Sequence, residues 1–320
     1  MRKIVALGGG HGLAASLSAL RRLTDDLTAV VTVADDGTSS GRLRQELGVL
    51  PPGDLREALV ALCGDGQEEQ IWTRVVQHRF SGAGPLGGHA VGNLLIVALW
   101  ELLGETVPAL EWMGRLLGAR GRVLPMAAVP LDIEARVRGA DSRRPREVST
   151  IRSQAAITTT RGTVLDIQLL PEHPPATPEV LAAVREADWV VLGPGSWFTS
   201  VLPHLLVPEL AAALIQTSAS KVVALNLAPQ FGETAGFFPE THLEVLAAYA
   251  PAFRVDVVLA DIQVIGDSSR LKQAAADLGA ELVVRSVART DGTPRHDPQR
   301  LAAAYNEIFR RSGGRIGLCR

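Results

Sequence analysis

Short apolar runs rich in β-branched residues alternate along this chain with longer segments whose apolar residues recur every three or four positions. The first such run covers residues 3–7, and the segment that follows, residues 13–22, places Leu13, Leu17 and Leu20 on one stripe. The run therefore predicts a buried strand and the segment an amphipathic helix. Repeated along the chain, this order is typical of a parallel sheet with crossover helices.

The same pattern predicts the remaining elements. We expect strands at residues 29–33, 188–192, 221–225, 255–260 and 281–285. We expect helices at residues 54–62, 68–79, 91–103, 108–117, 178–186, 200–217, 240–249, 269–278 and 298–311. Thr177 and Pro178 suit the N-cap and the first position of one of these helices. The predicted fold class is α/β, a Rossmann-like, doubly wound and mostly parallel sheet.

Residues 121–170 depart from this alternation. Three β-rich runs, at 122–130, 131–139 and 163–170, surround a polar, arginine-rich stretch. The three runs are typical of strands, and they favour an antiparallel insertion or an edge sheet. We therefore expect a β-rich insertion at about 121–170 within a single α/β domain that covers residues 1–320.

Composition narrows the class of protein. The net charge of −2 gives no overall field that would attract nucleic acid. Cys63 and Cys319 form no paired motif, which fits a reducing cytoplasm. The longest apolar run, at 94–100, is too short to cross a membrane. We expect a cytoplasmic protein without membrane insertion or a nucleic acid partner.

Four of the expected strands end in polar or glycine-rich residues. These ends are the glycine turn at 8–12, the acidic pair Asp35 and Asp36, the second glycine turn at 193–196, and Asn226. In a parallel sheet the carboxyl ends of the strands lie along one edge, where ligands bind. The convergence of the four ends predicts a ligand site at this edge.

The first glycine turn suits a phosphate, because glycines let the backbone approach it and the following helix N-terminus favours its charge. Gly10, Gly12 and Ala15 also fit a loose GxGxxA pattern, and Asp35 lies 23 residues after Gly12. By spacing alone this could be a dinucleotide fingerprint. An NAD(P)-binding oxidoreductase is therefore one alternative.

The polar cluster at 35–44 suits a phosphorylated, hydroxyl-rich ligand. Asp35 and Asp36 could accept hydrogen bonds from sugar hydroxyls or hold a magnesium ion. Ser39, Ser40 and Arg42 could bind a phosphate. Magnesium held against a leaving diphosphate would make the protein a transferase, which is a second alternative.

Further candidates follow along the chain. Asp54 could cap the helix that it begins or face the site, and His89 and Asn93 lie one helical turn apart. Ser196 and Thr199 offer hydroxyls at the second glycine turn, and Glu233 is either an acid–base group or a surface carboxylate. No zinc motif and no Walker lysine motif occurs in the sequence.

The motifs together resemble the YvcK/CofD-like family. The resemblance covers most of residues 3–240 and rests on GGGHGL, VTVADDGTSSGRLR, PPGDLREALVAL, QHRF, GHAVGNLLIVAL, GPGSWFTSVLPHLLVPEL and NLAPQFGET. The wording of the second and sixth motifs is nearest to the YvcK branch, the gluconeogenesis factors. CofD proteins themselves are 2-phospho-lactate transferases, which keeps the transferase alternative open.

The resemblance implies a Rossmann-like fold and a site for UDP-sugars such as UDP-N-acetylglucosamine. It also implies a cytoplasmic bacterial protein that acts in cell-shape or cell-wall regulation on gluconeogenic carbon sources, without implying a reaction or catalytic residues. We further expect a homo-oligomer, with magnesium as the one cofactor to consider. By motif, the implied site is Gly9, Gly10, Gly12, Asp35, Asp36, Ser39, Ser40, Arg42, His89, Asn93, Gly195, Ser196, Thr199 and Asn226.

Two positions and one region depart from the family pattern. His11 stands where the family often has threonine, and Thr38 stands where it has glycine. Threonine disfavours a positive φ, so the backbone at Thr38 must differ from that of a glycine turn or stay in an ordinary region. The last part of the chain, at about 250–320, matches poorly and is expected to diverge.

Overall fold

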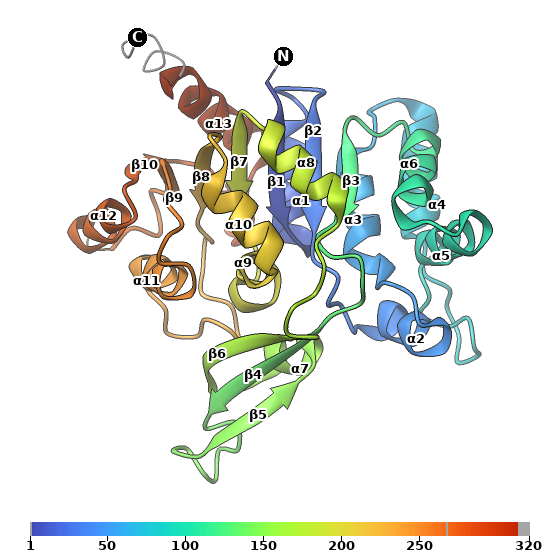
Figure 1. Cartoon of the computed structure of the whole chain (residues 1–320), viewed down its shortest axis with the longest axis horizontal. Helices are drawn as coiled ribbons and strands as arrows, with labels where there is room; N and C mark the ends of the chain where they lie inside the picture. Colours follow the sequence, from blue (N-terminus) through green and yellow to red (C-terminus); the bar gives the residue numbers. More distant parts are fainter. Residues whose placement is uncertain (1, 267, 313–320) are drawn as a thin grey trace.

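A seven-stranded parallel sheet forms the centre of the molecule, which is described here from a computed structural model covering residues 2–266 and 268–312 (Figure 1). Its strand order is β10-β9-β8-β7-β1-β2-β3, and every neighbouring pair is parallel. The strands are β1 (Ile4–Gly8), β2 (Leu27–Val31), β3 (Arg122–Pro125), β7 (Trp189–Leu192), β8 (Ser220–Ala224), β9 (Val257–Asp261) and β10 (Glu281–Arg285). This order confirms the doubly wound, Rossmann-like prediction.

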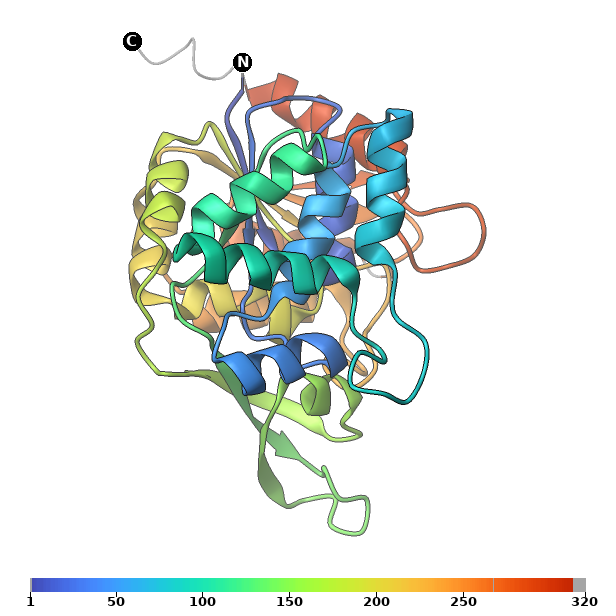
Figure 2. The same cartoon turned by 90° about the vertical axis from the view of Figure 1, so that its right-hand side faces the viewer.

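Helices cover both faces of this sheet. One face carries α8 (Pro178–Glu186), α9 (Pro203–Leu206) and α10 (Pro208–Gln216), and the other carries α1 (Gly10–Leu20), α3 (Pro52–Leu62) and α13 (Pro298–Ser312) (Figure 1 and Figure 2). The remaining helices flank the sheet: α2 (Thr38–Leu47), α4 (Gln67–Gln77), α5 (Val91–Leu103), α6 (Thr106–Leu116), α11 (Pro239–Tyr249) and α12 (Ser268–Asp277). Among the described residues, no helix is long and apolar enough to span a membrane.

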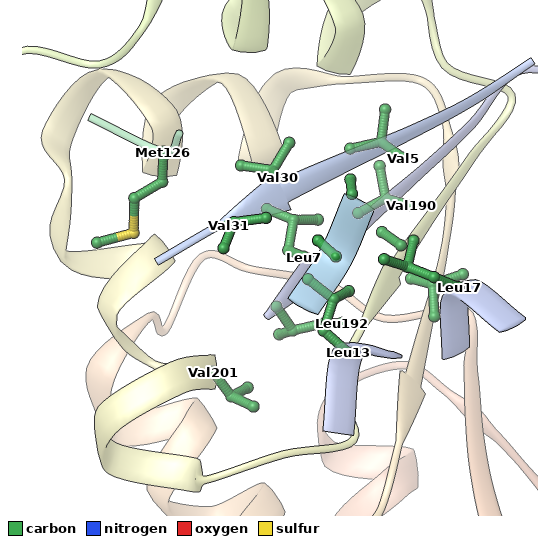
Figure 3. Packing of buried hydrophobic residues seen from close by; sticks show 14 of the residues in the cluster. Val5, Leu7, Leu13, Leu17, Val30, Val31, Met126, Val190, Leu192 and Val201 are labelled. Carbon is green, nitrogen blue, oxygen red and sulfur yellow. The ribbon is translucent and has the colours of Figure 1, made fainter. Parts of the chain in front are cut away.

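The core lies where the central strands meet these helices. Val5 and Leu7 of β1 pack beside Val30 of β2 and Leu192 of β7, and Leu17 of α1 lies in the same cluster (Figure 3). All five side chains are at most 2% exposed. Strands buried on both faces read as continuous apolar runs, which is why the sequence identified them.

The antiparallel insertion is smaller than predicted. Residues 122–125 form β3, which pairs in parallel with β2 at the edge of the main sheet and does not belong to the insertion. The insertion proper is a three-stranded sheet, β5-β4-β6, made of β4 (Asp132–Arg138), β5 (Val148–Arg152) and β6 (Thr163–Leu170), with helix α7 (Gln154–Thr159). It projects below the carboxyl ends of the main strands in Figure 1.

Two predicted segments differ in detail from the structure. Residues 38–47, for which the sequence pattern predicted no helix, form α2, whose first residue is Thr38, so this threonine has an ordinary helical backbone. Its first four residues, 38–41, are poor helix formers, but burial of Ser39, Ser40 and Leu43 stabilises the helix through tertiary contacts. The helix expected at 200–217 is divided into a π-helical turn, η1 (Trp197–Val201), followed by α9 and α10, each of which begins at a proline.

Candidate functional site

The two glycine turns meet at the point where the chain reverses its direction of winding. β1 and β7 are adjacent in the sheet, and the next strand along the chain lies on opposite sides of them. In such sheets the carboxyl ends at this position open a crevice that binds ligands. Residues 8–12 follow β1 and residues 193–196 follow β7, and we refer to them as the paired glycine turns.

Close packing explains two of the glycines: Gly12, where the backbones of the paired turns touch, and Gly9, which lies against the side chains of Thr32 and Asp54. A Cβ atom on Gly12 would lie 2.4 Å from both the carbonyl oxygen of Pro194 and Cα of Gly195. A Cβ atom on Gly9 would lie 2.5 Å from Oγ1 of Thr32 and 2.6 Å from Oδ2 of Asp54. Both positions therefore exclude any larger residue.

Asn226 fixes the second turn from the neighbouring strand. Its Oδ1 accepts a hydrogen bond from the N–H of Gly195 at 2.9 Å, and its Nδ2 donates to the carbonyl of the same residue at 2.8 Å. Gln230 donates through Nε2 to Oγ of Ser196 at 3.2 Å. Asn226 thus binds both backbone polar groups of Gly195, and the two hydrogen bonds position the turn more firmly than a single bond would.

A cavity of about 650 Å³ opens over the paired turns. Of the predicted site residues, seven line it: Gly9, Gly10, Gly12, Asp54, Gly195, Ser196 and Asn226. This volume is in the range of small-molecule sites. The structure therefore brings together the glycine turns, Asp54 and Asn226 in one cavity.

A further wall of the cavity comes from the C-terminal part, which the sequence analysis did not include in the site. Arg289, Arg295 and His296 line the cavity from the loop between β10 and α13. Burial lowers the pKa of His296 to about 4, so the two arginines carry the positive charge of this wall at neutral pH. The sequence feature that could have identified these residues is a fifth polar segment after a strand, residues 286–297, which follows β10 and contains both arginines.

Asp54 lies in the first turn of α3, whose N-cap is Pro51, so the alternative role as the helix cap is wrong. Its Oδ2 accepts a hydrogen bond from Oγ1 of Thr32 at 3.1 Å. Burial, together with the charges of Asp35 and Glu57, raises the pKa of Asp54 to about 8. The cavity therefore contains a carboxyl group that holds a proton near neutral pH.

Ser39, His89 and Asn93 form a buried network that does not line the cavity. Nδ2 of Asn93 donates to Oγ of Ser39 at 2.9 Å, and that oxygen lies 3.1 Å from Nδ1 of His89. Oδ1 of Asn93 accepts from Nε of Arg56 at 2.9 Å. Burial and the nearby charge of Arg42 lower the pKa of His89. These groups satisfy one another and join α2, α3 and α5.

The two aspartates at 35 and 36 are bound to different segments. Oδ1 of Asp35 accepts from the N–H of Gly37 at 2.8 Å, whereas Oδ1 of Asp36 accepts from the N–H of Ala155 in the insertion at 2.9 Å. Neither lines the cavity. Among the described residues, no group of three or more histidine, cysteine or acidic side chains could hold a metal ion. The two carboxylates are therefore held by separate segments, and magnesium at this pair stays a prediction.

The remaining residues of the polar cluster also contact protein groups. Oγ of Ser40 accepts from the N–H of Gly53 at 2.9 Å. Arg42 donates to the carbonyl of Gly87 at 2.9 Å and also to the carbonyl of Pro85. Neither residue lines the cavity over the paired turns. Residues 35–44, which we call the α2 segment, use most of these polar side chains to join neighbouring parts of the fold.

Thr199 and Glu233 form a buried contact behind the second glycine turn. Oγ1 of Thr199 donates to Oε1 of Glu233 at 2.6 Å, and the N–H of Phe198 donates to Oε2 at 3.0 Å. Burial raises the pKa of Glu233. This carboxyl group binds the first turn of η1, so it is neither a surface group nor part of the cavity lining.

Comparison with known proteins identifies the family. The model of the family described as "2-phospho-L-lactate transferase CofD" matches residues 4–291. A "Putative gluconeogenesis factor" of Mycobacterium tuberculosis is 54% identical over 314 residues, which cover 97% of this chain and 91% of the relative. The "Gluconeogenesis factor" of Bacillus subtilis is 37% identical over 84% of this chain and 82% of its own length.

A crystal structure agrees with the fold. A UPF0052 family member from Bacillus halodurans superposes with a TM-score of 0.83 at 32% identity, covering 95% of this chain and 98% of that one. The mycobacterial alignment spans nearly the whole chain, including most of the region that we expected to diverge. The chain therefore belongs to the CofD family, in the branch of the gluconeogenesis factors.

Proposed function

We propose that this protein binds a nucleotide sugar of the UDP-N-acetylglucosamine type in the cavity over the paired glycine turns. The observation that carries the proposal is the pairing itself. Two glycine turns in backbone contact at the carboxyl ends of β1 and β7 line one cavity together with Arg289 and Arg295. Backbone groups at a helix N-terminus and guanidinium groups are the usual partners of a diphosphate.

The rest of the cavity supports a sugar nucleotide. Asp54, Ser196 and Gln230 line it and offer carboxyl, hydroxyl and amide groups, which recognise sugar hydroxyls. The dinucleotide alternative depends on Asp35 as the ribose-binding carboxylate, and Asp35 does not line the cavity. This placement favours the sugar nucleotide over NAD(P).

Thermal shift and calorimetry with UDP-N-acetylglucosamine test the proposal, with UMP, GDP and NADH as competing ligands. We expect a stabilised wild-type protein, since a ligand at 100 times its Kd adds about 2.7 kcal/mol to the free energy of unfolding. Arg295→Ala should weaken binding at least about tenfold. Arg146→Ala removes an exposed arginine of the insertion and is the matched control. No stabilisation of the wild type at millimolar ligand would refute the proposal.

We also propose that the binding serves a role in growth on gluconeogenic carbon sources and in cell-shape or cell-wall regulation in the cytoplasm. The name gluconeogenesis factor, carried by the relatives, supports the part of this role that concerns gluconeogenic growth. A Bacillus subtilis strain that lacks its own relative should recover normal growth and shape on such carbon sources with this gene but not with its Asn226→Ala variant. Equal rescue by both genes would mean that the role in growth and cell shape does not depend on ligand binding in the cavity.

The description of the family model favours one other function, transfer of a phosphorylated group from a nucleotide donor. The acid Asp54 in the cavity is the group of this chain that such a reaction could use for proton transfer. Release of UMP from the bound nucleotide sugar, or of GMP from a GDP-linked donor, in the presence of candidate acceptors would support transfer of a phosphorylated group. Bound donor that stays intact would favour the binding role.

A further inference from the structure

A buried hydrogen-bonded chain links the C-terminal helix to the second glycine turn. Oγ of Ser16 in α1 lies 3.0 Å from the carbonyl oxygen of Gly193 and 2.9 Å from the hydroxyl oxygen of Tyr305 in α13. Ser16 and Tyr305 are both 0% exposed. Three elements far apart in the sequence thus meet at one serine hydroxyl behind the cavity.

The direction of this chain follows from the number of protons. Ser16 has a single hydroxyl hydrogen, and the carbonyl of Gly193 can only accept. Ser16 therefore donates to Gly193, and Tyr305 must donate to Ser16. Burial raises the pKa of Tyr305, so the phenol keeps the proton that this arrangement needs.

The ring of Tyr305 is held in place by aromatic packing. It stacks on Phe309 with ring centroids 5.9 Å apart, and Phe309 packs on Trp189 of β7 at 4.5 Å. Helix α13, which carries Tyr305 and Phe309, begins directly after the loop that brings Arg289 and Arg295 to the cavity. The C-terminal part therefore contacts the site in two ways, through the arginines at its wall and through Tyr305 behind the turn.

We propose that Tyr305 is a positioning residue for the ligand site: through Ser16 it holds the carbonyl of Gly193 and so orients the glycine turn at 193–196. Gly193 has φ +76°, a region where glycine has no side chain to restrain it. Asn226 holds the turn at Gly195 from one side, and the Tyr305–Ser16 chain holds it at Gly193 from the other. The effect on ligand rests on the proposed function, whereas the effect on the turn does not.

Tyr305→Phe tests the proposal, because it removes the hydroxyl and keeps the stacked ring. The chain has only two tyrosines, and Tyr249→Phe is a matched control. The hydroxyl of Tyr249 accepts from the N–H of Ile167 in the insertion, away from the glycine turns. We expect a loss of thermal stability from both variants. Only Tyr305→Phe should raise the Kd for UDP-N-acetylglucosamine, by about tenfold.

Hydrogen exchange in the ligand-free protein provides a readout that does not depend on the proposed function. The amides of Gly195 and Ser196 should exchange several times faster in Tyr305→Phe than in the wild type or in Tyr249→Phe. Ser16→Ala should reproduce this change, and the double variant should add little to either single variant. Unchanged exchange in Tyr305→Phe would overturn the positioning role. If the wild type bound no ligand while the exchange changed as expected, only the proposed function would fail.

Discussion

The paired glycine turns and the α2 segment look alike in the sequence, but they use their polar groups differently. Both regions follow a central strand at its carboxyl end and are rich in glycine and polar residues. The glycine turns line the cavity with backbone and small side chains. The α2 segment directs the side chains of Ser39, Ser40 and Arg42 onto other protein groups.

This difference shows that polar residues at a strand end indicate which edge of the sheet is near the ligand site, but not whether those residues line the site or bind other parts of the protein. A polar side chain that is buried must find a hydrogen-bond partner, and the partner can be the protein itself. A glycine turn has no polar side chain to satisfy, and those of its backbone groups that no other segment binds stay available to a ligand, unlike the N–H and carbonyl of Gly195, which Asn226 binds. The glycines, rather than the carboxylates and hydroxyls of the α2 segment, were the better guide to the cavity.

The largest effect should come from closing the contact between the glycine turns. In an ordinary helix, Gly12→Ala would stabilise the protein by about 1 kcal/mol. Here the new Cβ atom would lie 2.4 Å from backbone atoms of Pro194 and Gly195, which cannot give way as a flexible side chain could. We expect a net loss of about 3 kcal/mol in the free energy of unfolding and no detectable nucleotide-sugar binding.

Urea denaturation and calorimetry measure these two effects. Gly84→Ala is the control, because a Cβ atom on Gly84 meets nothing within 4 Å. Its stability should stay within about 0.5 kcal/mol of the wild type. A stable Gly12→Ala variant that binds ligand normally would show that the two turns are not as close as described.

Two asparagines separate the regions most directly. Asn226→Ala should cost about 2 kcal/mol, because it leaves the N–H of Gly195 without its partner, and it should weaken binding more than tenfold. Asn93→Ala should cost a similar amount, because Ser39 and the buried Arg56 lose a partner, but ligand affinity should stay unchanged. Urea denaturation measures the stability of both variants, and calorimetry measures their ligand affinity. Equal losses of affinity would mean that the α2 segment and the glycine turns do not differ in their contribution to the site.

The sequence was sufficient for most of the fold, since the apolar runs of β1, β2 and β7 are buried on both faces and leave a clear pattern. It could not show that residues 122–125 pair with β2, because a four-residue strand carries no sign of its partner. It also could not tell that Ser39 would contact His89 or that Arg289 would reach the cavity. Both depend on contacts between distant segments, which local patterns do not contain.

Asp54 lies between the two regions, and its titration gives a pH-dependent prediction. Its pKa is raised from 3.8 to about 8, so the folded protein binds more protons than the unfolded chain between about pH 4 and pH 8. Stability contributed by this group therefore falls as pH rises through that window and levels off above it. Asp54→Asn should be more stable than the wild type at pH 8 by about 1.5 kcal/mol, after allowance for screening, and the difference should vanish near pH 4.

Asp65 provides a control of opposite sign. A hydrogen bond from Arg21 lowers the pKa of Asp65, so its contribution is present at neutral pH and is lost as pH falls through its folded-state pKa. Asp65→Asn should be the less stable protein at pH 7, with the difference disappearing in acid. Urea denaturation from about pH 2 to pH 8.5 measures both variants, because the folded-state pKa of Asp65 lies below its ordinary value of 3.8. A gap for Asp54→Asn that does not change with pH would mean that its carboxyl group is charged in the folded protein.

The smallest expected effect belongs to Arg42, the residue of the α2 segment whose chemistry best suits a phosphate. Because its guanidinium group donates to the carbonyls of Gly87 and Pro85, Arg42→Ala should cost about 1 kcal/mol of stability by releasing the loop before α5. Arg42→Lys should recover only part of this loss, since one ammonium group does not reproduce a planar fork. Neither variant should change the Kd for UDP-N-acetylglucosamine, measured by calorimetry. A tenfold weakening in both would mean that Arg42 leaves its carbonyl partners for the ligand, and the α2 segment would then belong to the site after all.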